Sequence, residues 1–259
     1  MSRPFYTEFA WAYDLLVPDP VSERVAFIIH MLKQHDVVPG AHILDAGCGT
    51  GRYSIALAKL GFIVTGIDAS HEQIAEAGKR QDRSGTNVNF IVADICKPQP
   101  NVIFNAILCR GVLNDLTDDA SRQSVFDAFA RMMHPGGVLI LDVREWNATE
   151  TRKRIQPVFE KEVATDKGRL KFQSITELDP KTKTLIVYET HQLDKEGETQ
   201  RETYTFRMRC WTYEELEARL TDAHFQKVQY FSDYDTQAPL GSSDRIVAVA
   251  SSGLGVSQP

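Results

Sequence analysis

The sequence lacks any cysteine pattern of the kind that holds a metal ion or a disulfide framework. Its four cysteines (Cys48, Cys96, Cys109 and Cys210) are far apart and form no C-x-x-C pair. Structural zinc sites and disulfide-rich secreted domains both depend on closely spaced cysteines. We therefore expect reduced, mostly buried thiols, no bound metal and a cytoplasmic protein.

Long apolar runs and an excess of positive charge are also absent. No uninterrupted apolar run approaches the roughly 20 residues that a membrane-spanning helix needs, and the first residues do not resemble a secretory signal. The formal net charge of -6 provides no overall electrostatic footprint for nucleic acid. The expected partner is therefore a small-molecule substrate, with neither nucleic acid nor a membrane.

A strand, a glycine-rich turn and a helical segment follow one another in residues 42–60. Apolar residues lead to Asp45, three alternate glycines follow, and an amphipathic run comes next. Such a turn lets backbone amides approach a ligand closely. In the dinucleotide fingerprint G-x-G-x-x-G the third glycine would fall at Arg52. A nicotinamide-dependent oxidoreductase therefore fits this turn poorly.

Two further apolar segments end in an acid, at Asp68 and at Asp94. A carboxylate at the carboxyl end of a parallel strand can accept hydrogen bonds from both hydroxyls of a ribose. Ser70 and Gln73 form a capping box for the next helix, so Asp68 is not required as its cap. We expect Asp68 to bind a ribose.

The pattern D-x-G-x-G-x-G at residues 45–51, followed by the two strand-end acids, resembles the class I S-adenosylmethionine (SAM)-dependent methyltransferases. The likeness is to the small-molecule branch that includes glycine and amino-sugar N-methyltransferases. It implies an enzyme that uses SAM and releases S-adenosylhomocysteine (SAH). In that family the acid at Asp94 meets the adenine amino group, and a tyrosine placed like Tyr13 lies in an arm that closes over SAM. The implied cofactor-binding set is Tyr13, Asp45, Gly47, Gly49, Gly51, Arg52, Asp68, Ala69, Asp94, Ile95, Cys109 and Arg110.

The order of segments and the resemblance predict an α/β fold, a seven-stranded doubly wound sheet with an antiparallel last strand. Strand-like runs between residues 170 and 209 predict an antiparallel β insertion that forms a lid. Alternatively, this insertion is a dimer interface or a solvated sheet face. The sequence is compatible with both a monomer and a homodimer. The expected divisions are an N-terminal helical arm over the active site (1–40), the SAM-binding core (41–145), the lid (146–210) and a C-terminal helix with a β-hairpin (211–259).

The sequence shows no catalytic signature, so the catalytic residues stay unknown at this point. A sulfonium methyl is already activated, and proximity and orientation can be sufficient for its transfer. The turn that begins at Cys109 is not the [Asp/Asn]-Pro-Pro-aromatic turn of enzymes that methylate nucleic-acid amines or glutamine, which favours a small-molecule acceptor. The candidates for the substrate pocket are Tyr13, Arg144, Trp146, His191, Tyr204, Arg207, Arg209 and Trp211.

Arg207 and Arg209 share one face of a predicted strand. They are either a clamp for an anionic acceptor or part of a solvated face. The predicted reaction is transfer of the SAM methyl group to a nitrogen or oxygen of a small metabolite. The alternatives are O- or C-methylation in natural-product biosynthesis on the same scaffold, and a SAM- or nucleotide-binding regulatory module without turnover.

Overall fold

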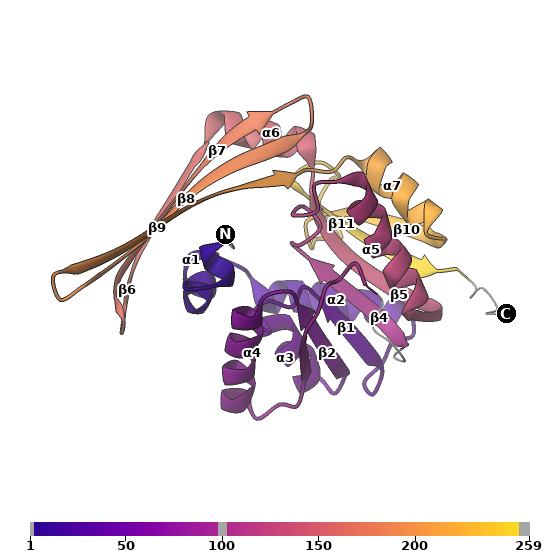
Figure 1. Ribbon diagram of the computed structural model, residues 1–259. Helices are drawn as coiled ribbons and strands as arrows, with labels where there is room; N and C mark the ends of the chain where they lie inside the picture. The colour runs from indigo at the N-terminus through magenta and orange to yellow at the C-terminus, as the bar shows by residue number, and fades with distance from the viewer. Residues whose placement is uncertain (1–2, 98–102, 254–259) are drawn as a thin grey trace.

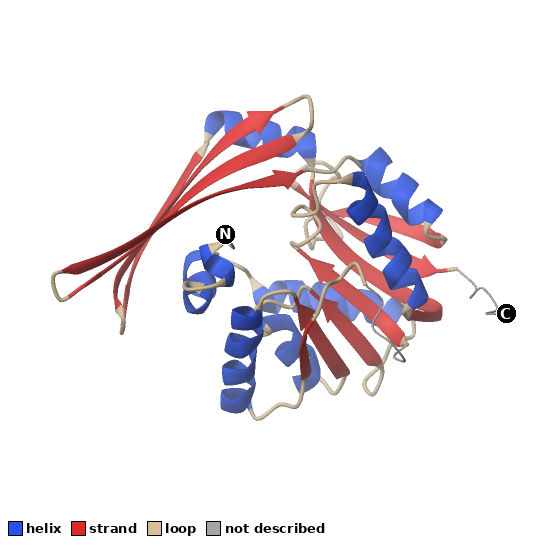
Figure 2. Cartoon of the chain, viewed as in Figure 1, coloured by secondary structure: helices blue, strands red, loops and turns tan. Residues whose placement is uncertain are grey.

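The structure, a computed structural model, describes residues 3–97 and 103–253 and has two β-sheets (Figures 1 and 2). The larger sheet has seven strands in the order β10-β11-β5-β4-β1-β2-β3. Its strands are β1 (His42–Ala46), β2 (Ile63–Asp68), β3 (Asn89–Val92), β4 (Phe104–Arg110), β5 (Met133–Arg144), β10 (Phe225–Ser232) and β11 (Arg245–Ser252). The last strand, β11, runs antiparallel to both its neighbours, β10 and β5, which confirms the predicted fold class.

The inner strands of the large sheet are buried on both faces. β4 and β5 carry nearly continuous apolar runs, as strands covered by helices on both sides do. The helices are α2 (Val21–Gln34), α3 (Arg52–Lys59), α4 (His71–Ser84), α5 (Asp119–Arg131) and α7 (Tyr213–Asp222). α2 and α3 pack in one apolar cluster with the sheet, and α5 and α7 pack in another. No helix among the described residues has the length and apolar composition of a membrane span.

The smaller sheet is a four-stranded antiparallel meander that projects from the core as a long twisted arc (Figure 1). It contains β6 (Val158–Thr165), β7 (Gly168–Asp179), β8 (Thr184–Lys195) and β9 (Glu198–Arg209), and α6 (Trp146–Ile155) precedes it. The sequence did not predict β6 or α6. β6 has no buried residue and α6 has only two, so neither carries the apolar signal of a core element.

The chain's first described segment lies between the small sheet and the core (Figure 1). It comprises two 3₁₀ turns, η1 (Pro4–Tyr6) and η2 (Ala10–Ala12), and the short helix α1 (Tyr13–Leu16). We call residues 3–19 the arm. Its aromatic residues pack against Leu170 and Phe172 of β7. The expected arm of residues 1–40 differs from this arrangement, because α2 belongs to the helical layer on the large sheet.

Candidate functional site

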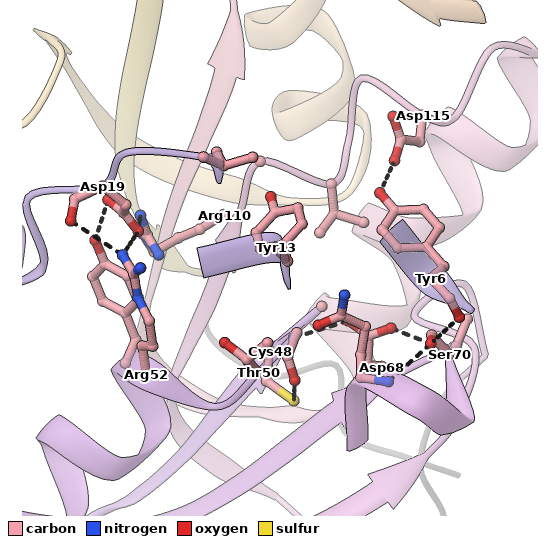
Figure 3. A pocket seen from close by; sticks show the side chains of 18 of the residues that line it. Tyr6, Tyr13, Asp19, Cys48, Thr50, Arg52, Asp68, Ser70, Arg110 and Asp115 are labelled. Atoms are coloured by element: carbon pink, nitrogen blue, oxygen red, sulfur yellow. Dashed lines mark hydrogen bonds and ion pairs between the residues drawn. The ribbon is translucent and has the colours of Figure 1, made fainter. Parts of the chain in front are cut away.

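A cavity of about 480 Å³ opens at the carboxyl ends of β1, β2 and β4, beneath the arm (Figure 3). This volume lies within the range of small-molecule sites. Parallel α/β sheets bind ligands at this end, where the strand order reverses. The arm contributes Tyr6, Tyr13, Asp14 and Asp19 to the lining. The cavity is therefore built jointly by the glycine turn and by residues far from it in the sequence.

The first two glycines of the motif line the cavity with left-handed backbone. Gly47 has φ +76° and Gly49 has φ +53°. A Cβ atom on Gly47 would lie 2.2 Å from Val112 Cγ2, so a side chain there would collide with the loop after β4. These positions keep the backbone open to a ligand, as the sequence predicts.

Gly51 does not line the cavity, so its assignment to the cofactor-binding set stays a prediction. It is the N-cap of α3 with φ +74°, and a Cβ atom there would lie 2.6 Å from the Phe90 ring and 3.0 Å from Ala77 Cβ. The third glycine therefore permits α3, α4 and β3 to pack closely behind the turn.

Gly51→Ala is expected to lower the free energy of unfolding by about 2 kcal/mol, because it adds overpacking to a left-handed backbone. Chemical denaturation of the purified variant measures this loss. Gly78→Ala is the matched control, since Gly78 lies in α4 with open space around it. A Gly51 variant as stable as the native protein would contradict this role.

Asp68, at the end of β2, organises the turn. Its Oδ2 accepts the Gly49 amide at 2.9 Å and its Oδ1 accepts the Ser70 amide at 2.9 Å. Burial raises the pKa of this carboxyl group, while those backbone amides act in the opposite direction. Ser70 Oγ accepts the Gln73 amide at 3.0 Å and caps α4, so Asp68 is not the cap. Each carboxylate oxygen keeps a second lone pair.

Three other predicted residues line the same end of the cavity: Ala69, Asp94 and Ile95. Asp94 lies two residues beyond the end of β3, and its Oδ1 accepts the Cys96 amide at 2.9 Å. Because these residues come from two adjacent strand ends, they meet at one edge of the sheet. The structure therefore brings the ribose and adenine candidates together.

Asp45 and Cys109 are buried and do not line the cavity, so their inclusion in the cofactor-binding set stays a prediction. β1 continues one residue past Asp45, and the Asp45 carboxylate accepts a hydrogen bond from Ser54 Oγ of α3 at 2.5 Å. Burial raises the pKa of both side chains. Asp45 thus ties β1 to α3, beneath the glycine turn.

Arg52 and Arg110 both line the cavity, and both are paired with Asp19 of the arm (Figure 3). Arg52 Nη2 lies 3.0 Å from Asp19 Oδ2 and Arg110 Nη2 lies 3.6 Å from it. Asp14 of the arm accepts Thr50 Oγ1 at 2.7 Å. The charges at this end are therefore largely neutralised within the protein, and they fasten the arm to the glycine turn.

Tyr13 lines the cavity as predicted, and the structure adds two residues that the sequence analysis missed. Tyr6 donates its hydroxyl hydrogen to Asp115 Oδ2 at 3.0 Å (Figure 3). Burial raises the pKa of Asp115, although the nearby Arg3 and the Tyr6 hydrogen bond oppose that rise. The sequence signal for Asp115 is weak, because it lies in a loop with several other acids.

The remaining substrate candidates do not line the cavity. His191 is fully buried among Phe5, Phe9 and Phe172, where its Nε2 lies 3.4 Å from Glu189 Oε2. Trp211 and Trp146 pack in two apolar clusters, and Tyr204 stacks on Phe206 in the small sheet.

The arginine candidates are also elsewhere. Arg144 pairs with Asp244 at 2.6 Å, and Arg209 pairs with Asp119 at 2.7 Å and with Glu215 at 3.1 Å. Arg207 is exposed on β9. Neither Arg207 nor Arg209 lines the cavity, so the structure gives the clamp hypothesis no support.

The sequence matches a family described as a methyltransferase domain over residues 43–137. A protein of Geobacillus sp. (strain WCH70) that is named as a methyltransferase is 25% identical over 95% of this chain and 98% of its own. A ubiquinone biosynthesis O-methyltransferase of Xanthomonas campestris pv. campestris is 36% identical over 107 residues. That match spans 40% of this chain and 43% of the relative, less than half of its length.

Two solved structures share the fold at low sequence identity. A SAM-dependent methyltransferase from Clostridium acetobutylicum has a TM-score of 0.81 and 19% identity, and it covers 96% of this chain and 99% of its own. A sugar N-methyltransferase from Streptoalloteichus sp. has a TM-score of 0.76 and 17% identity, over 95% and 92%. Residues 43–137 thus match a methyltransferase domain, and almost the whole chain shares the fold of these two solved structures.

Proposed function

We propose that this chain is a SAM-dependent methyltransferase that methylates an amine nitrogen of a small molecule, and that Asp115 removes the proton from that amine. The observation that carries the proposal is the Asp115 carboxylate, which lines the same cavity as Asp68 and the glycine turn. An acceptor that enters beside the arm meets this carboxylate and the Tyr6 hydroxyl. The solved sugar N-methyltransferase with the same fold supports nitrogen as the target.

Charge favours a cationic acceptor over the anionic one considered from the sequence. Arg52 and Arg110 are held by Asp19, and Arg245 pairs with Asp142. Asp115 accepts the Tyr6 hydroxyl through Oδ2, and its second oxygen can accept a hydrogen bond from an ammonium group. A buried carboxylate stabilises a nearby ammonium ion, and the acceptor's charge in turn favours an ionised Asp115.

The reaction requires the amine lone pair, which protonation occupies. SAM, when bound, supplies a methyl on a cationic sulfur, so the nitrogen lone pair forms the new C–N bond while the C–S pair stays on sulfur. Asp115 accepts the ammonium proton, and Tyr6 keeps the carboxylate oriented by its hydrogen bond. We propose that Asp68 binds the ribose of SAM and that Asp94 and Ile95 bind its adenine. Tyr13 and Arg52 would lie at the methionine end.

Asp115→Asn is expected to lower kcat by about 100-fold, the scale of a lost general base. The native activity should fall as pH decreases through the pKa of Asp115, which burial places above that of an ordinary aspartate. The variant should lose this acid limb. Both effects are measured by assaying the methylation of a panel of small amines at several pH values, with the release of SAH as the signal.

The exposed acid Asp166, in the β6–β7 turn, offers a matched control in Asp166→Asn. A lower rate with an unchanged pH profile would contradict proton removal by Asp115 and leave it a positioning role. An enzyme that methylates phenols but no amines would instead support O-methylation, the activity for which the Xanthomonas relative is named.

A further inference from the structure

The side chain of Gln73, in the first turn of α4, has a fixed orientation. It is only 2% exposed, and its Nε2 donates to the Phe5 carbonyl oxygen of the arm. A carbonyl oxygen can only accept, so the amide nitrogen must face Phe5 and the amide oxygen must face the other way. The direction of Oε1 therefore follows from the hydrogen bond itself.

Gln73 Oε1 is a buried acceptor without a partner among the described residues. Gln73 lines the cavity, and its Oε1 lies 3.7 Å from the position that a Cβ atom on Gly49 would occupy. Gly49 donates its amide to Asp68, so this oxygen stands beside the acid proposed for the ribose. A buried acceptor left unpaired is unfavourable, so a donor from a bound ligand would be strongly preferred here.

We propose that Gln73 Oε1 accepts a hydrogen bond from a ribose hydroxyl of the cofactor, and that this bond couples cofactor binding to closure of the arm. This inference rests on the SAM site and on the ribose role proposed for Asp68. Gln73 is a positioning residue, because the same amide that meets the hydroxyl holds the Phe5 carbonyl.

The coupling has a short structural path. Ser70 Oγ donates to the Tyr6 carbonyl oxygen at 2.7 Å, so two successive arm residues are bound to the start of α4. Tyr6 also holds Asp115 through its hydroxyl. A ligand that orders Gln73 therefore stabilises the arm and the proposed base together. By linkage, the closed arm must raise cofactor affinity by the same factor.

The experiment measures SAH affinity by calorimetry and hydrogen exchange of the arm, residues 3–19, with and without SAH. For the native protein, SAH should slow exchange in the arm by about 10-fold or more. Gln73→Leu, which loses both bonds, should weaken SAH binding by about 10-fold and abolish the slowing. Lys79→Gln, at an exposed position of α4, is the control and should match the native protein.

Two further comparisons separate the two halves of the proposal. SAH analogues that lack either the 2′- or the 3′-hydroxyl are compared with SAH itself. One of the two analogues, the one without the hydroxyl that Gln73 accepts, should bind the native protein more weakly than SAH does. That difference should shrink in Gln73→Leu, as a double-mutant cycle requires. Gln73→Glu keeps an acceptor but cannot donate to Phe5 when ionised, so SAH should no longer protect its arm.

Native-like SAH affinity and arm protection in Gln73→Leu would overturn the proposal, as would native arm protection in Gln73→Glu. Failure of the native protein to bind SAH would instead contradict the cofactor assignment itself. Circular dichroism of both variants checks that the fold is intact. The outcomes are therefore distinguishable from those of the amine and Asp115 experiments, which measure turnover.

Discussion

Asp68→Ala is expected to weaken SAH binding by about 100-fold, equivalent to about 2.7 kcal/mol. The substitution removes the carboxylate proposed to bind the ribose hydroxyls. It also frees the amides of Gly49 and Ser70, which Asp68 accepts at 2.9 Å each. The glycine turn thus loses both a ligand contact and its preorganisation. Calorimetric titration of the purified protein with SAH measures the change directly.

The exposed acid Asp82 on α4 provides the matched control, since Asp82→Ala removes the same charge away from the cavity. Asp68→Asn should give an intermediate loss, because one acceptor oxygen remains. Equal affinity in native protein and Asp68→Ala would exclude Asp68 as the ribose anchor. The thermal midpoint of each variant without ligand shows whether reduced binding reflects a damaged fold.

Arg122→Met is expected to produce the largest loss of stability, about 4 kcal/mol, with a thermal midpoint lower by about 10 °C. Arg122 is completely buried. Its guanidinium donates to the Leu116 carbonyl at 2.8 Å, to the Cys210 carbonyl at 3.2 Å and to Glu215 Oε1 at 2.9 Å. Methionine fills similar space but leaves these acceptors without their donor.

The contacts of Arg122 also join parts of the chain that are far apart in sequence. Its guanidinium lies 3.9 Å from the Trp211 ring centroid, against the segment between β9 and α7. Burial lowers the pKa of Arg122 to about 10, so the side chain remains cationic near neutral pH. The loop that carries Asp115 is held to this guanidinium by the hydrogen bond from Arg122 to the Leu116 carbonyl. Loss of Arg122 should therefore loosen both that loop and the base of the small sheet.

Urea denaturation gives the free energy of unfolding for this test. Arg131→Met, at an exposed position near the end of α5, is the control and should change stability by less than about 0.5 kcal/mol. Hydrogen exchange should rise around residues 113–116 and 209–211 before the rest of the core. A variant within 1 kcal/mol of the native protein would show that the buried cation contributes little net stability.

The elements of the SAM-binding core follow from short-range sequence signals. Apolar runs predicted β1, β2, β4 and β5, and the capping box at Ser70 placed the start of α4. β6 and α6 escaped prediction because exposed elements outside the core need no strong apolar pattern. Their position depends on pairing with β7, which lies in a different part of the sequence.

The roles of single residues also differ in whether short-range sequence signals could predict them. The sequence placed Asp68 and Asp94 correctly at the cavity because carboxyl ends of parallel strands always meet at one edge of the sheet. It could not place Arg207 and Arg209, because a two-residue spacing shows which side chains share a face but not what that face meets. Arg209 meets Asp119 and Glu215.

The sequence by itself determined the class of fold and the strand ends that form the cavity. These depend on contiguous patterns: alternate glycines, apolar strands and caps. Only the tertiary structure decided that Tyr6 meets Asp115, that Gln73 holds the arm through Phe5, and that Gly51 serves packing. Phe5 and Gln73, 68 positions apart, and Tyr6 and Asp115, 109 positions apart, come together because the arm is buried against the small sheet and α4. That burial depends on the summed packing of many side chains, and no local motif encodes it.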